Sequence, residues 1–442
     1  MDSPRGRLNL FALLFPILFE NVMLTLQGTV NTAVLSDYSD NAVAAVGVAN
    51  SIISVVTLVG TAVSIGATVV ISIAIGEANE RKTRELTFTA LAVCLGFSVL
   101  ITPVLLLFSE SLLTMLNLSG EILMLSKQYF DIRMLFFTFT MMTSSIMAIL
   151  RCYGYPKYTF IIGFLTNIIN LALNILVVYF PDYAPIGGVR GVAYSVVISN
   201  SVGVIIAIIL LLRLKIRLGL PRSVSDMLGY IKSILKVGIP AGLSNMMFTA
   251  SQLITTSFVA IIGDWALSAK VYYMNILNYV YLFSSAAGNA NALMVGRCQG
   301  EGDFERPERM NAQLIRLTTV VNLAVSLSVL VFSKPLLSIF TDDSAVFTLA
   351  VGIFAVDIIT EQARAISQVY EYALRAAGDI VFTTGILAVS CVVFSLGLAY
   401  FLAIPSGLGL IGCWIGLAAD ETTRAVVTYL RWKRGIWKTK KL

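Results

Sequence analysis

Residues 158–180 read YTFIIGFLTNIINLALNILVVYF, a stretch without a single Asp, Glu, Lys or Arg. A helix of this length crosses the hydrocarbon core of a bilayer, which is about 30 Å thick. Backbone N–H and C=O groups find no water there, so a spanning segment must bond to itself as a helix. The next stretch, 187–212, has the same character and contains one charged residue, Arg190. These stretches predict an all-α integral membrane protein.

The composition of the whole chain agrees with this prediction. Of its 442 residues, 57% are hydrophobic and 13% are charged, whereas soluble domains contain about 25% charged residues. The chain has no histidine, which excludes a zincin and a Ser-His-Asp triad. It also lacks the phosphate-binding motif GxxxxGK[ST]. We therefore expect no enzyme, no catalytic residues, no metal site and no cofactor. The five cysteines form no CxxC pair and are expected to be buried apolar residues: Cys94, Cys152, Cys298, Cys391 and Cys413.

Twelve stretches are long and apolar enough to span a membrane. The first resembles a signal peptide, but it is too long, contains Glu20 and lacks a small-residue cleavage site, so we expect a spanning helix there. The approximate limits of the twelve spans are 8–36, 42–75, 87–108, 124–150, 158–180, 187–212, 234–262, 266–296, 312–340, 346–374, 380–403 and 409–430.

The distribution of basic residues tests this count. With the N-terminus in the cytoplasm, 24 of the 31 basic residues lie in cytoplasmic segments and three lie within spans. Cytoplasmic loops of membrane proteins carry such an excess of Lys and Arg. We therefore expect both termini to be cytoplasmic, and the basic loops to face anionic lipid rather than nucleic acid. The four residues assigned to the outer side are Lys127, Arg190, Lys270 and Lys334.

The two halves of the chain repeat one another at an offset of 224 residues. Pro16 matches Pro240, and Arg151 matches Arg375. Each half holds six spans, an even number, so both halves have the same orientation in the membrane. This predicts two six-helix bundles related by a pseudo-two-fold axis along the membrane normal, as in secondary transporters that work by alternating access. The expected divisions are an N-terminal bundle at 1–212, a cytoplasmic linker at 213–233 and a C-terminal bundle at 234–442.

Several short motifs, in their order and spacing, carry a family resemblance over nearly the whole chain. They are Pro16-Ile-Leu-Phe-Glu20, Gly28 to Ser36, Ala44 to Gly47, Gly66 to Gly76, Arg151-Cys-Tyr-Gly154, Asn170-Leu-Ala-Leu-Asn174, Gly188-Val-Arg-Gly191, Leu374 to Asp379 and Gly412 to Gly416. Together they resemble the multidrug and toxic compound extrusion (MATE) family in its bacterial branches. The resemblance implies an antiporter of the bacterial inner membrane that exports amphipathic, often cationic compounds in exchange for protons or sodium.

The chain departs from this family pattern at positions where the family carries acids. Many members have a carboxylate in the first span at the position of Asn31, and some have one in the fifth span at the position of Asn174. The family's acid in the seventh span has no equivalent here. Asn cannot titrate near neutral pH, but it can offer a carbonyl oxygen to sodium or a hydrogen bond to a substrate.

The tenth span concentrates the charges. Its polar residues are spaced alternately by four and three positions, which places them on one helical face. Four charged residues at about 3 kcal/mol each would cost ~12 kcal/mol facing lipid, so the stripe must face protein or water. We expect a coupling-ion site around Glu361, then Asp357, with Glu371 as a further member; the alternative is a structural ion-pair ladder. The full stripe is Asp357, Glu361, Arg364, Gln368, Glu371 and Arg375.

Other candidates lie on the first, fifth and seventh spans. Glu20 is either a further coupling or cation-binding acid or the partner of a cytoplasmic-side arginine. The expected substrate-cavity residues, for which interhelical hydrogen bonding is the alternative role, are Gln27, Asn31, Asn170, Asn174, Gln252 and Arg364. In the twelfth span, Asp420, Glu421 and Arg424 are expected to form structural ion pairs.

The expected function is export of organic cations by a monomer in the lipid bilayer. The alternative is a flippase of lipid-linked sugar precursors, which requires a cationic cavity for pyrophosphate. The three arginines within spans, Arg133, Arg364 and Arg424, are few and have acids nearby. The exporter is therefore favoured. Its coupling ion can be a proton or sodium, because oxygen ligands bind both.

Overall fold

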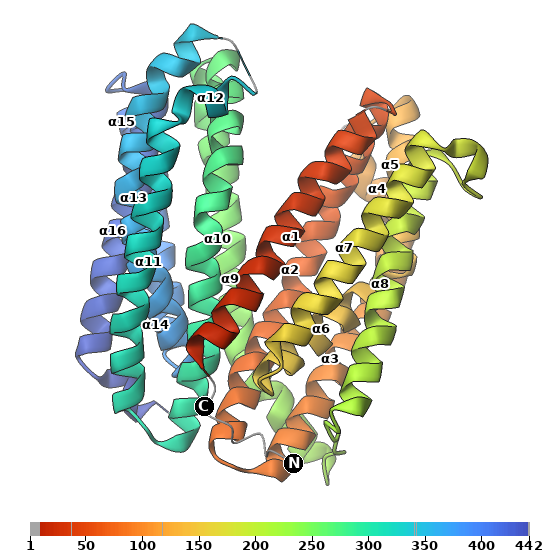
Figure 1. The fold of residues 1–442 in the computed structure, drawn as a ribbon, viewed down its shortest axis with the longest axis vertical. Coiled ribbons are helices and arrows are strands. Elements are labelled where there is room, and N and C mark those ends of the chain that lie inside the picture. Colours follow the sequence, from red (N-terminus) through yellow and green to blue (C-terminus); the bar gives the residue numbers. More distant parts are fainter. Residues whose placement is uncertain (1–8, 37, 117, 340, 342, 441–442) are drawn as a thin grey trace. The chain divides into compact units, whose positions relative to one another are not determined.

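A computed structural model describes residues 9–440 except 37, 117, 340 and 342 (Figure 1). The described chain contains helices and no strand. It divides into two compact units, Met1–Ile239 and Pro240–Leu442. The predicted linker 213–233 is part loop and part helix, because α8 ends at Arg213 and α9 begins at Val224.

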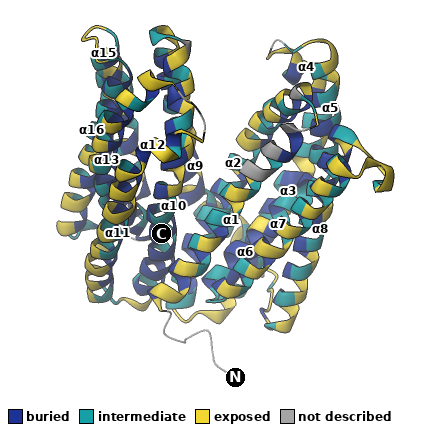
Figure 2. Ribbon diagram, turned by 45° about the horizontal axis from the view of Figure 1, so that its top comes forward, coloured by how far each residue is buried: buried dark blue, intermediate teal, exposed yellow. Residues whose placement is uncertain are grey.

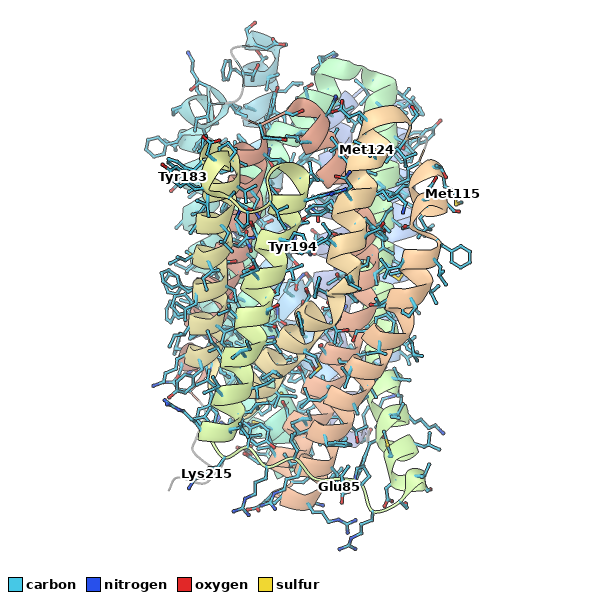
Figure 3. The ribbon with its side chains drawn as sticks, turned by 90° about the vertical axis from the view of Figure 1, so that its right-hand side faces the viewer. Glu85, Met115, Met124, Tyr183, Tyr194 and Lys215 are labelled. Carbon is cyan, nitrogen blue, oxygen red and sulfur yellow. The ribbon has the colours of Figure 1, made fainter. Side chains whose placement is uncertain are left out.

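Unit 1 contains six spanning elements. The fourth is bent by 51° between α5 and α6, and α7 packs against both α1 and α8. Figure 3 shows Glu85 and Lys215 at one end of this bundle and Met115, Met124 and Tyr183 towards the other, as expected for helices that alternate in direction. The elements are α1 (Leu10–Ser36), α2 (Asp40–Gly76), α3 (Glu80–Leu107), α4 (Ser109–Thr114), α5 (Gly120–Leu135), α6 (Phe137–Cys152), α7 (Pro156–Tyr179), η1 (Pro181–Tyr183) and α8 (Gly188–Arg213).

Unit 2 has the same order of elements. In its fifth span, α14 continues through a π-helical segment into α15. Its elements are α9 (Val224–Ile262), which begins in unit 1, α10 (Asp264–Glu301), α11 (Glu305–Val331), α12 (Ser333–Leu337), α13 (Ser344–Ala376), α14 (Ile380–Ser390), η2 (Cys391–Leu398), α15 (Ala399–Ala403), α16 (Gly409–Lys433) and η3 (Ile436–Thr439).

These elements supply the twelve predicted spans. Nine described helices are long and apolar enough to cross a membrane, and the bent pair α5 and α6 makes a tenth. The remaining two, α10 and α16, are 38 and 25 residues long but too polar to pass the same test. A polar helix can span a membrane only with its polar face against protein. This requirement places the polar faces of α10 and α16 against protein within unit 2.

The repeat is visible in packing and in backbone geometry. Ala42 and its equivalent Ala266 are both fully buried, and Figure 2 shows buried residues on the inward faces of the helices. Gly154 and its equivalent Gly378 both adopt positive φ, 85° and 89°, at matching helix ends. Such a conformation favours glycine because it has no Cβ. The predicted burial of all five cysteines is also confirmed, and none is bonded to another.

Glycine lets the start of α9 approach α2 closely within unit 1. A Cβ on Gly66 would overlap the backbone carbonyl of Ile234, and one on Gly238 would lie 2.5 Å from the carbonyl oxygen of Ala62. Small residues at such crossings let helix backbones touch inside a membrane. The first half of α9 is therefore held against unit 1 by direct backbone contact.

We predict that Gly66→Ala destabilises the protein by about 1–3 kcal/mol, because the backbone of α9 must shift to admit the methyl group. The measurement is the thermal-unfolding midpoint of the detergent-purified protein. Gly47→Ala is the matched control, since it lies on the same helix and its Cβ would meet nothing within 4 Å. Equal midpoints for the two variants would show that the α2–α9 contact is loose.

Candidate functional site

The polar stripe of α13 is buried inside unit 2. Helix α13 packs against α10, α11 and α16, and all six stripe residues are at most 8% exposed. Glu361 is fully buried and Asp357 is 3% exposed. The prediction that this face avoids lipid is confirmed. An unpaired charge at such a depth is costly, so the partners of each group decide what the site can do.

An ion-pair network joins α13 to α16. Arg364 contacts the Glu361 carboxylate on its own helix and donates from Nε to Oε1 of Glu421 at 3.1 Å. Arg424 lies 2.6 Å from the same Glu421 oxygen and 3.3 Å from Oε1 of Glu371. Glu421 therefore lies between two guanidinium groups, one from each helix. This is more than the local pairing predicted for α16, because the network crosses between helices.

Two hydroxyl groups complete the network. Ser367 donates to Oε2 of Glu421 at 2.9 Å, and Ser395 of the π-helical segment donates to Oδ2 of Asp420 at 2.9 Å. Ser367 thus bonds the Glu421 oxygen that the guanidinium groups do not contact. Oδ2 of Asp420, in contrast, accepts from both Ser395 and Nη2 of Arg424, the latter at 3.4 Å. Buried ion pairs of this kind are stable only when their remaining lone pairs are satisfied.

The network contains more carboxylates than guanidinium groups. Five acids, Asp357, Glu361, Glu371, Asp420 and Glu421, face three arginines, Arg364, Arg375 and Arg424. If all are ionised, the excess is two negative charges. Asp357 takes part in none of the ion pairs found among the described side chains. Its Oδ2 and Oε2 of Glu361 are buried without a hydrogen-bond partner. These two oxygens can accept a proton or contribute to a cation site.

A cavity adjoins the network within unit 2. Its walls include Arg364, Arg375, Gln368 and Glu371 of α13. Two tyrosines in the wall hold the guanidinium groups: Arg364 lies 5.4 Å from the ring centre of Tyr281, and Arg375 lies 5.4 Å from that of Tyr372. Such stacking stabilises a cation at an aromatic face. The cavity places a small open space beside charged groups that are otherwise buried.

A network of amides joins α1 to α7 in unit 1. Gln27 donates to Oδ1 of Asn170 at 2.8 Å, and Asn174 donates to Oδ1 of Asn31 at 2.8 Å. The structure thus brings together four residues predicted for the substrate cavity. Nδ2 of Asn170 and Oδ1 of Asn174 have no partner in the described chain, so the network keeps one donor and one acceptor available. It carries no charge.

Glu20 lies in the same unit but belongs to a different contact. Its carboxylate accepts from Arg151 at 2.8 Å and from the Thr159 hydroxyl at 3.2 Å. The arginine partner considered in the sequence is therefore present. Gln252, in contrast, lies beside Lys270 at a separate small cavity of unit 2 and does not join the α13–α16 network.

Comparison with known proteins identifies the family. The MatE family model matches residues 16–176 and 240–401, one match in each half of the chain. The chain belongs to the MATE family. The two matches agree with the expected repeat, because they begin at the equivalent residues Pro16 and Pro240.

Relatives and solved structures extend the match over nearly the full chain. An uncharacterised transporter, YisQ of Bacillus subtilis, is 32% identical over 432 residues, covering 97% of this chain and 94% of the relative. A probable multidrug resistance protein, NorM of Thermotoga maritima, is 29% identical over 451 residues, covering 99% and 94%. A crystal structure of MATE in complex with MaL6 matches with a TM-score of 0.89 at 19% identity, covering 98% and 97%. The predicted all-α membrane fold, with twelve helices in two bundles, is confirmed.

Some members of this MATE site were not predicted. Asn322 of α11 donates to Ser284 at 2.7 Å and to the backbone carbonyl of Glu361 at 3.1 Å, which fixes the helix that carries the central acid. Ser367 and Ser395 were also missed. Serine and asparagine side chains commonly form hydrogen bonds between membrane helices. No local sequence pattern therefore distinguishes these three residues from others of the same type. Only the fold brings them to the carboxylates.

We predict that Arg424→Gln lowers the stability of this MATE protein by about 3–5 kcal/mol, because it leaves buried carboxylates without their cation. Asp420 would lose its only ion pair among the described side chains, which joins it to Nε of Arg424 at 3.3 Å. The thermal-unfolding midpoint of purified protein measures the effect. Arg434→Gln, at an exposed position just after the same helix, is the control. A midpoint as high as that of the control would mean that the network contributes little to stability.

Proposed function

We propose that this chain is a secondary transporter that exports amphipathic organic cations in exchange for protons or sodium. The coupling ion binds at Glu361 and Asp357 on α13. The observation that supports this proposal is the pair of buried carboxylate oxygens, one on each residue, that have no partner in the described structure. The multidrug resistance proteins among the relatives support the substrate class.

Exchange follows from the charge of the site. The network has two more carboxylates than arginines, so two bound monovalent cations neutralise it and a single one leaves one negative charge. A proton, a sodium ion and an organic cation all satisfy this requirement, and each binds less well while another is present. A ligand shifts a conformational equilibrium only through its different affinities for the two states. Competition between coupling ion and substrate then links their opposite movements.

The members of the network have different roles in this proposal. Both oxygens of Glu371 already face cations, at 3.5 Å from Arg375 and 3.3 Å from Arg424. Glu371 therefore positions the arginines, whereas Glu361 and Asp357 bind the ion. Arg364 contacts Glu361 and lines the cavity, so it couples binding at the ion site to binding of a substrate in the cavity.

The amides of unit 1 complement this charged site. Gln27, Asn31, Asn170 and Asn174 cannot exchange protons near neutral pH, but their carbonyl oxygens can bind sodium or hydrogen-bond a substrate. Glu20 keeps its charge balanced by Arg151 and serves as a structural acid. In this proposal the proton-dependent or sodium-dependent step is confined to unit 2.

We further propose that the protein works as a monomer in the bacterial inner membrane, with both termini in the cytoplasm. The excess of basic residues in the loops on one side supports this orientation.

We predict that Glu361→Gln abolishes ion-driven export of a fluorescent organic cation from proteoliposomes. Removing this negative charge removes the ligand for which ion and substrate compete. Export is measured under an imposed proton gradient and then under a sodium gradient, and the effective gradient identifies the coupling ion. Asp357→Asn is expected to weaken export in the same assay.

Glu305→Gln is the matched control, because Glu305 lies in the first turn of α11 with its side chain 91% exposed. It should export at the wild-type rate. Wild-type export by a well-folded Glu361→Gln protein would remove Glu361 from the mechanism. Failure of either gradient to drive export of several cations by the wild type would overturn the cation-antiport proposal, and lipid-linked sugar precursors would then be tested.

A further inference from the structure

Lys270 of α10 is a buried cation in unit 2. The distribution of basic residues assigns it to the outer side of the membrane, and the residue is only 7% exposed. Its Nζ donates to the Thr256 hydroxyl at 2.7 Å and to the backbone carbonyl of Gln252 at 3.4 Å. Both acceptors are uncharged. No carboxylate in the described part of the chain forms an ion pair with Lys270, so the described groups that its ammonium contacts are all neutral.

The three buried arginines of the α13–α16 network differ from Lys270 because they are paired with acids. Arg364, Arg375 and Arg424 each contact at least one carboxylate. The fold does not require a cation at the position of Lys270 either. The equivalent residue at the offset of 224 is Val46, an ordinary member of the apolar core of unit 1. A charged residue that replaces a core valine inside a membrane indicates a functional role.

Lys270 borders a small cavity that also contains an unfilled donor. Trp414 of α16 lines the same cavity and is 3% exposed. Its indole N–H has no acceptor among the described atoms, although buried Trp N–H groups usually find one. The ring is fixed by edge contact with Tyr273 at 6.1 Å between centres. The described residues that line the cavity include no Asp or Glu. An ammonium and an indole N–H therefore border one small, otherwise mostly apolar space.

A group that fits this space must be negative, must accept hydrogen bonds and must be small. We propose that the cavity beside Lys270 and Trp414 binds a monovalent anion, either free chloride or the carboxylate of an exported compound. The carboxylate source rests on the export function proposed above, whereas chloride binding does not. In both cases the anion neutralises the charge of Lys270, with which no described carboxylate forms an ion pair.

The anion site is connected to the α13–α16 network. Ser395 lines the cavity and donates to Asp420. Thr255, another lining residue, donates to the backbone carbonyl of Ser395 at 3.4 Å. Binding of an anion at this site therefore affects the carboxylates through the contacts of the π-helical segment. Unit 2 can therefore accept both ends of a zwitterion, or a cation together with chloride.

The test measures anion binding without transport. The full-length protein is purified in detergent with methanesulfonate as the only anion, and its thermal-unfolding midpoint is followed as chloride or benzoate replaces methanesulfonate at constant ionic strength. A ligand that binds only the folded state raises the midpoint, and the rise grows with the logarithm of the ligand concentration once this exceeds the dissociation constant. We expect such a rise for wild type, and Lys270→Met should weaken anion binding by about tenfold or more because a charge-assisted contact is lost.

Two further variants keep the test decisive. Lys334→Gln removes an exposed lysine of the same unit and should leave the anion dependence unchanged. Trp414→Phe keeps an aromatic ring but removes the N–H, so it should weaken binding less than Lys270→Met does. Iodide quenching of tryptophan fluorescence gives a second readout, in which Trp414→Phe should lose the saturable component.

The outcomes separate the two anion sources and the two proposals. A midpoint that rises with chloride identifies a halide site, and a midpoint that rises with benzoate alone identifies a carboxylate subsite. A wild-type midpoint that depends on neither anion overturns the proposal, as does a dependence that Lys270→Met retains. Failure of organic-cation export in proteoliposomes would leave these binding results unchanged, so the anion site and the export function can fail separately.

Discussion

The absence of water from the bilayer core is the constraint on which the rest of this structure depends. For the backbone, it forces every span to be helical, since an unsatisfied N–H or C=O costs several kcal/mol there. For side chains, it makes a buried charge costly unless an oppositely charged group or a ligand lies beside it. In unit 2, α13 and α16 therefore pack with their charged faces together, and Glu421 is shared between Arg364 and Arg424. A charge that stays without an opposite partner, as at Asp357 or Lys270, is best explained by a ligand that arrives and leaves.

The pattern of the sequence was sufficient to predict the fold and part of the site. Length and hydropathy predict twelve spans, and the alternating spacing of four and three predicts that Asp357 through Arg375 share a buried face. Both predictions depend on properties of a single helix. The partner of each charge depends on which helices meet and at what height, and no local pattern specifies this. For that reason Glu421 was expected to pair locally, and Ser395 was not considered. The position of Lys270 near the start of a span predicts its side of the membrane but not its burial.

The two repeats show how one framework came to hold different chemistry. Arg151 and Arg375 occupy equivalent positions, but their partners differ. In unit 1 the acid is Glu20 on the first helix of the repeat, and the pair is closed at 2.8 Å. The equivalent of Glu20 in unit 2 is Ser244, which cannot neutralise an arginine, and Glu371 of α13 contacts Arg375 at 3.5 Å instead. The Nε atom of Arg375 remains without a partner in the described structure, beside the cavity. Moving the acid from one helix to another has changed a closed structural pair into an open one.

This difference supports a division of labour between the repeats. The polar contacts of α1 with α7 are neutral amides and the bond from Thr159 to Glu20. Arg151 compensates the charge of Glu20, so a change of ion concentration has little to act on in unit 1. Unit 2 contains a surplus of carboxylates on α13 and α16 and an ammonium on α10, and no ion pair joins them among the described side chains. If these opposite charges lay within contact distance, they would neutralise one another and bind nothing. Kept apart, they leave one position for a cation and another for an anion. The strength of the buried ion pairs therefore matters less to function than the two places where a pair is missing.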